Sequence, residues 1–279
     1  MSDEASADAG HARRGPLLAW GMVALAMAAI WTWIARSPQL LEMLPLASDL
    51  HGLVMFYVVL FLPLIPFALL LGLVTRTRVA RAGASPAAFG LLGLVLGGGG
   101  LCLAVLYAWL NGCVIAGPPS AIMPELALLG VALILVQTSA EEFLVRGWLQ
   151  PVLVEQVGPW VGIALASALF AALHLAGGPV AWHSLANMVL AGLLFGVLAW
   201  RSGGLVAPIA AHFAWNLAED VGFGLAPNPG IGPFGALRDL ELAGPALWGG
   251  GSEGLNASLG TTIVLAALIL PFLARRGAP

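Results

Sequence analysis

Two adjacent carboxylates and a guanidinium stand together in the run AEEFLVR at residues 140–146. Charged residues make up only 9% of the chain, so such a group is conspicuous. An ionisable side chain at the centre of a bilayer costs about 2.5 to 3.5 kcal/mol. Three of them within one short run therefore indicate a functional site, where a carboxylate could act on a water or a metal.

Helical geometry assigns the two glutamates different tasks. Glu142 and Arg146 are four residues apart, so they share one face of a helix and can neutralise each other. Glu141 points about 100° away, onto the face of Gln137 one turn earlier. It stays free to act on a water or a metal. The alternative is an interfacial salt bridge with Glu141 exposed to solvent near a helix end, and these charges alone do not decide between the two.

A histidine follows in the next apolar segment, where FAALH ends at His174. A lone histidine in such a place is more often a satisfied core residue than a catalyst. However, if the helix that carries Glu141 continues to a turn at Gly158-Pro159, Glu141 lies 17 residues before Gly158 and His174 lies 16 after it. Along antiparallel helices both would lie about 24 to 26 Å from the turn, so we expect the two side chains to meet.

A third polar pair comes later in the chain, where His212 and Asn216 are four residues apart. On one helical face they can donate hydrogen bonds to a developing oxyanion, or hold a metal or water. The alternative is a polar clamp between membrane helices, which typically contributes about 1 kcal/mol. Glu219 and Asp220 lie near the end of the same segment, where a hydrated helix terminus is favoured.

The elements that position these residues are predicted from composition. With 60% hydrophobic residues and a mean hydropathy of +0.95, the chain is predicted to be an all-α polytopic transmembrane bundle of about eight spans. A net charge of −3 gives no indication of nucleic-acid binding, and two cysteines indicate neither a disulfide framework nor a thiolate metal site. The predicted spans are 17–35, 52–74, 88–110, 122–145, 160–177, 184–200, 204–222 and 257–274.

Basic residues alternate between the predicted loops and give the topology. We expect a cytoplasmic tail at 1–15 and a membrane domain at 16–279, with both termini in the cytoplasm. A cleaved signal peptide is the alternative for the first segment, but its apolar character continues as far as Arg36, which favours a retained span. The arginines assigned to the cytoplasmic side are Arg13, Arg14, Arg76, Arg78, Arg81, Arg146, Arg201, Arg275 and Arg276, with Arg36 and Arg238 as exceptions.

The motifs form an ordered set, EExxxR at 141–146, FxxxH at 170–174 and HxxxN at 212–216. This set closely resembles the CAAX protease and bacteriocin-processing (CPBP) family of intramembrane endopeptidases, which includes the type II CAAX prenyl endopeptidases. The resemblance covers roughly residues 120–222, the expected catalytic core. Asn187 and the GxxxG spacing at 192–196 are also similar to the family's intervening helix, where glycines permit close packing.

The resemblance implies hydrolysis of a peptide bond inside the membrane. Glu141 and His174 would activate a water as general base, while His212 and Asn216 would stabilise the tetrahedral oxyanion. The chemistry of the residues agrees, because desolvation raises the basicity of a carboxylate and an imidazole can pass the proton to the leaving amine.

The same resemblance leaves supporting roles and a metal to consider. Glu142, held ionised by Arg146, would fix the helix that aims Glu141. Family members have also been described as metalloproteases, so a divalent metal such as zinc stays open, with Glu141, His174 and His212 as its ligands. The chain has no HExxH helix, which favours a water activated by glutamate.

The expected partners are a membrane-anchored or lipidated protein or peptide substrate and the lipid bilayer, and not nucleic acid. We expect a multi-pass protein of the bacterial inner (plasma) membrane. A transporter, or a non-catalytic scaffold, could use the same polar cluster for proton relay or partner binding. A transporter predicts paired repeats with broken helices, and the sequence has none.

Overall fold

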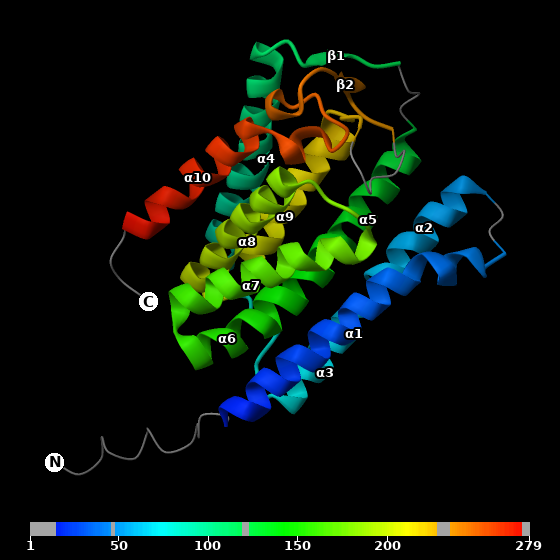
Figure 1. The fold of residues 1–279 in the computed structure, drawn as a ribbon. Helices are drawn as coiled ribbons and strands as arrows, with labels where there is room; N and C mark the ends of the chain where they lie inside the picture. The colour runs from blue at the N-terminus through cyan, green and yellow to red at the C-terminus, as the bar shows by residue number, and fades with distance from the viewer. Residues whose placement is uncertain (1–14, 46–47, 119–122, 228–234, 275–279) are drawn as a thin grey trace.

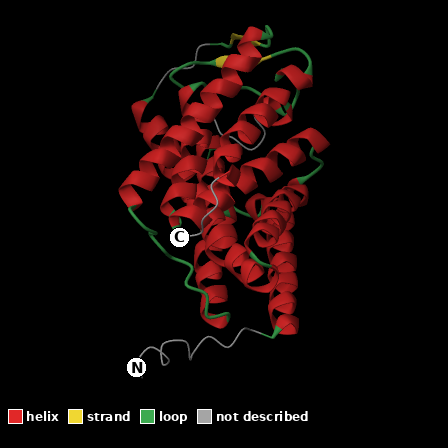
Figure 2. Cartoon of the chain, turned by 90° about the vertical axis from the view of Figure 1, so that its left-hand side faces the viewer, coloured by secondary structure: helices red, strands yellow, loops and turns green. Residues whose placement is uncertain are grey.

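The computed structural model describes residues 15–45, 48–118, 123–227 and 235–274. Nearly all of the predicted tail, residues 1–14, lies outside the described residues, as do Arg275 and Arg276. Of the described residues, most are helical and two short strands lie at one end of the molecule (Figure 2). The predicted all-α class is confirmed.

Ten α-helices within the described ranges build the bundle (Figure 1). Six helical stretches are long and apolar enough to cross a membrane; the last two predicted spans correspond to the shorter α9 and α10, so about eight spans agrees with the structure. The helices are α1 (Pro16–Glu42), α2 (Asp49–Leu60), α3 (Leu64–Val74), α4 (Pro86–Leu110), α5 (Pro124–Glu142), α6 (Gln150–Val157), α7 (Pro159–His174), α8 (Trp182–Ser202), α9 (Val206–Leu217) and α10 (Leu259–Ala274).

The helix that carries the two glutamates continues far beyond its predicted end at residue 145. A π-helical segment, η1 (Phe143–Leu149), joins α5 to α6, and the whole stretch Pro124–Val157 covers 34 residues. The turn lies at Gly158, with a φ of +82° that favours glycine, and Pro159 begins α7. The predicted hairpin between α6 and α7 is therefore confirmed (Figure 1).

Glycines bring α4 unusually close to α9, the helix that carries His212. A Cβ atom added at Gly93 or Gly97 would collide with the backbone of Ala207 or Ala211, while Gly99 has open space around it. Small residues at such contacts let membrane helices approach closely. Because Ala211 directly precedes His212, this packing fixes the backbone that presents the histidine.

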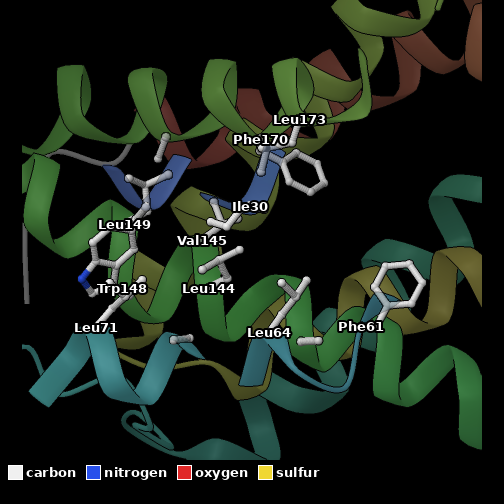
Figure 3. Packing of buried hydrophobic residues seen from close by; sticks show 14 of the residues in the cluster. Ile30, Phe61, Leu64, Leu71, Leu144, Val145, Trp148, Leu149, Phe170 and Leu173 are labelled. Carbon is white, nitrogen blue, oxygen red and sulfur yellow. The ribbon is translucent and has the colours of Figure 1, made fainter. Parts of the chain in front are cut away.

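The η1 segment contributes to one of the two apolar cores formed by the described residues. Figure 3 shows Leu144 and Val145 between Leu64 of α3 and Phe170 of α7. Trp148 is fully buried there, and its Nε1–H donates to the Thr75 hydroxyl at 3.1 Å. The carboxylate-bearing helix is thus packed on two sides just beyond its two glutamates.

The Gly/Pro-rich stretch 223–256, which lies between the last two predicted spans, contains a strand in its described part. β2 (Leu240–Leu242) pairs antiparallel with β1 (Val114–Ala116), with Val114 opposite Leu242. Asn187 of α8 donates from Nδ2 to the carbonyls of Asn256 and Ser258, at 2.8 and 3.0 Å. These bonds join the stretch and the start of α10 to α8.

Candidate active site

The centre of the site is the Glu142 carboxylate, which is fully buried at the end of α5. Arg146, 1% exposed on η1, donates from Nη1 to Glu142 Oε1 at 2.9 Å, so the predicted pair forms. The same oxygen accepts a hydrogen bond from His212 Nδ1 of α9 at 3.0 Å. One oxygen of Glu142 therefore accepts hydrogen bonds from both the Arg146 guanidinium and the His212 imidazole.

These bonds fix the orientation of the His212 ring. A carboxylate paired with Arg146 can only accept, so His212 Nδ1 carries the proton that it donates to Glu142. The other ring nitrogen, Nε2, lies 3.8 Å from Glu141 Oε2, which is longer than a hydrogen bond. The ring thus presents Nε2 toward Glu141.

Glu141 lies on the helix face that its spacing from Gln137 predicted. Its Oε1 accepts from Gln137 Nε2 at 3.5 Å, and its side chain is 14% exposed, so the predicted shared face with Gln137 is confirmed. Glu142 beside it has no exposure. Of the two carboxylates, Glu141 is the one that a water or a substrate can reach.

His174 lies at the end of α7 and turns toward its own backbone. Its Nδ1 donates to the Phe170 carbonyl at 3.0 Å, which leaves a lone pair on Nε2. Within the described ranges no hydrogen bond or ion pair joins His174 to Glu141, so the expected direct meeting is not made. Instead, the Phe170 ring lies edge-on to both imidazoles, with centroids 5.0 Å from His174 and 6.3 Å from His212.

Asn216 lies one turn beyond His212 on α9, as its spacing predicts. It is half-buried, and its carboxamide makes no hydrogen bond to any residue that the structure describes. The amide is therefore available to a ligand.

Arg146 makes further contacts that sequence reasoning missed. Its Nη2 donates to the Gly192 carbonyl of α8 at 3.0 Å. Its guanidinium carbon lies 4.8 Å from the Phe170 ring centroid and 5.4 Å from that of Phe195. The GxxxG spacing was the available signal for the contact with α8, whereas nothing in the sequence singled out Phe195.

The burial of Glu219 and Asp220 contradicts the expected hydrated helix terminus. Glu219 and Asp220 are only 5% and 8% exposed, in the π-helical segment η3 (Ala218–Gly222), and do not form a hydrated helix end. The fully buried Tyr57 of α2 lies within electrostatic range of Asp220 and Glu141. Packing of η3 against α5 encloses these carboxylates.

The proposed metal ligands do not form a metal site. Among the described residues no group of three or more histidine, cysteine or acidic side chains is arranged to hold a metal ion. Within the described ranges no hydrogen bond or ion pair joins His174 to Glu141, and His212 Nε2 lies 3.8 Å from Glu141 Oε2. The set Glu141, His174 and His212 therefore does not fit zinc, which needs its ligands around one point at about 2 Å.

Together, the fold and the site define a class, an integral membrane protein with a buried polar centre built from α5, η1, α7 and α9. Within it, residues 123–218 match the family model described as Type II CAAX prenyl endopeptidase Rce1-like. The resemblance predicted from the motifs is confirmed over these residues. No curated protein and no solved structure matches the chain.

Proposed function

We propose that the chain is an intramembrane endopeptidase that hydrolyses a peptide bond with a water activated by Glu141 and His174. The observation that carries the proposal is the arrangement around Glu142. It orients His212 so that Nε2 faces the accessible carboxylate of Glu141, at 3.8 Å. The match of residues 123–218 to a membrane endopeptidase family supports the same activity.

In the first step, Glu141 takes a proton from the water as its oxygen attacks the carbonyl carbon of the substrate. A C–O bond forms and the carbonyl electrons move onto the oxyanion. His174, whose Nε2 lone pair is free of the helix backbone, shares the proton. The oxyanion then re-forms the carbonyl as the C–N bond breaks, and the proton passes to the leaving amine.

The oxyanion is held by His212 and Asn216. Removal of one donor from an oxyanion site typically lowers kcat by about 10²- to 10³-fold. To donate from Nε2 while Nδ1 donates to Glu142, the His212 ring must carry both protons, and the negative charge of the oxyanion offsets that of the imidazolium. Glu142 thereby supports the site through His212 as well as through Arg146.

For the substrate we propose a membrane-anchored or lipidated protein or peptide. The catalytic core, at about 120–222, lies inside the membrane domain 16–279, in the bacterial inner membrane. The arginines in the segment between α3 and α4 and at the end of α8 support the proposal that both termini face the cytoplasm.

The test compares the membrane proteome of cells with the wild-type protein and cells with Glu141→Gln. We expect uncleaved precursors to accumulate with Glu141→Gln. The matched control is Glu125→Gln, the same change at an exposed position in the first turn of α5, which should leave the precursors processed. A proteome identical to wild type with Glu141→Gln would contradict the proposal and favour a scaffold.

A further inference from the structure

The His212 ring is held by an aromatic side chain of α8, a helix that carries no member of the proposed catalytic set. Phe195 is 3% exposed, and its ring stacks on that of His212 with centroids 4.7 Å apart and planes at 20°. Phe170 meets the same imidazole at 89°. One ring therefore lies against the face of His212, and another meets it at right angles.

Two parallel hydrogen bonds fix the position of α8 along the helical stretch that carries Arg146 and Gln150. Arg146 Nη2 donates to the Gly192 carbonyl and Gln150 Nε2 donates to the Gly196 carbonyl, both at 3.0 Å. The donors are four residues apart on one helical stretch and the acceptors four apart on the other, so the bonds form two rungs. Phe195 directly precedes the second rung. Sliding α8 would break both bonds and remove Phe195 from His212.

Packing alone does not account for the second rung, because the Gln150 side chain is energetically expensive to bury. Gln150 is 4% exposed, and its Oε1 has no hydrogen-bond partner among the described residues. A buried carboxamide in a membrane bundle is expensive unless its polar atoms bond. At Gly196, an added Cβ would lie 2.8 Å from both Gln150 Oε1 and the Ile163 side chain. Glycine here lets the two helices approach closely enough for the rung.

We infer that Phe195 is a positioning residue for His212, and that the rung from Gln150 to Gly196 sets the register of α8 that brings the two rings together. The inference rests on the proposed function. With Phe195 against its face, the imidazole keeps Nδ1 on Glu142 and Nε2 toward Glu141. Without that face the ring can turn, and Nε2 no longer meets the oxyanion.

The first test needs no substrate. With the histidines labelled with nitrogen-15, NMR of the full chain in detergent should give a hydrogen-bonded Nδ1 proton that is lost in His212→Ala. We expect Phe195→Leu to lose the same signal, and Phe195→Tyr, which keeps an aromatic face, to retain it. The matched control is Phe213→Leu, the same change beside His212. An unchanged Nδ1 signal in Phe195→Leu would overturn the inference.

The second test is kinetic and uses a peptide from the precursor that accumulates with Glu141→Gln. We expect Phe195→Leu and Gln150→Met each to lower kcat by up to about 10²-fold with little change in KM, because a small misplacement of a group at the reacting centre can cost that much. Gln156→Met, on the same helix, should behave as wild type. Because both residues act on one ring, the double variant should lose no more than the single variants. Additive losses would contradict a role of the rung through Phe195.

The two proposals fail in different ways. If Glu141→Gln keeps full cleavage, the proposed function is wrong. If Glu141→Gln abolishes cleavage while Phe195→Leu keeps both the wild-type kcat and the Nδ1 signal, only the positioning role is wrong.

Discussion

His212 Nδ1 and Glu142 Oε1 lie 3.0 Å apart although their residues are separated by 70 positions in the chain. The contact makes the fully buried carboxylate a shared partner of Arg146 and His212. A change at Glu142 should therefore affect both the charge pair and the orientation of the imidazole.

The effects of Arg146 and Glu142 on stability should be strongly coupled. Arg146→Met leaves Glu142 buried without its cation, and removal of one partner of such a pair typically costs about 3 to 5 kcal/mol. The double variant with Glu142→Gln should lose less stability than the sum of the single variants, measured by thermal unfolding in detergent. Strictly additive losses would contradict the coupling.

The close approach of α4 to α9 gives a matched pair of glycine variants. Gly97→Ala should destabilise the protein by about 1 to 3 kcal/mol and lower cleavage, because the new methyl group meets the Ala211 backbone beside His212. Gly99→Ala, with open space around it, should be neutral or stabilising by up to about 1 kcal/mol. Equal effects of both changes in the same unfolding assay would argue against this packing.

The Thr75 hydroxyl should stabilise the fold by accepting the hydrogen bond of the Trp148 indole. Thr75→Val removes the acceptor of the buried indole N–H and should cost about 1 to 3 kcal/mol. Thr32→Val is the control, because the exposed Thr32 hydroxyl bonds only to the Ala28 carbonyl of its own helix. Its effect should stay within about 0.5 kcal/mol. A stable Thr75→Val variant would show that the indole finds another partner.

Asn216 should act on the transition state. Asn216→Ala should lower kcat about 10²- to 10³-fold with little change in KM, because a donor to the oxyanion is lost. Steady-state kinetics on the accumulated precursor measures both constants. A rise in KM with unchanged kcat would place Asn216 in substrate binding instead.

Metal chelation should leave cleavage intact. Among the described residues, no three carboxylate, imidazole or thiol groups are arranged to hold a metal ion. Purified protein dialysed against a strong zinc chelator should keep its kcat. Loss of cleavage that returns on adding zinc would overturn metal-free activation of the water by Glu141 and His174.

Helical phase and hydropathy were sufficient for the relationships within one helix or one hairpin. They predicted the pairing of Glu142 with Arg146, the shared face of Glu141 and Gln137, and the turn at Gly158. Each depends on spacing along a continuous helix, which the sequence contains.

Contacts between distant helices could not be predicted in this way. The bond from His212 to Glu142 and the stacking of Phe195 depend on how α8 and α9 pack against η1. The burial of Glu219 and Asp220 could not be predicted either. Apolar periodicity alone does not reveal that η3 continues the helix into the interior. His174 was predicted to meet Glu141, but its side chain bonds to the local Phe170 carbonyl, which spacing along the chain does not reveal.

The most direct test of a water activated by Glu141 is cleavage of the accumulated precursor by purified protein in heavy-oxygen water. The wild type and Glu125→Gln should place the heavy oxygen in the new C-terminal carboxylate, and folded Glu141→Gln should yield no labelled product. Full-rate cleavage with label incorporation by Glu141→Gln would contradict the account.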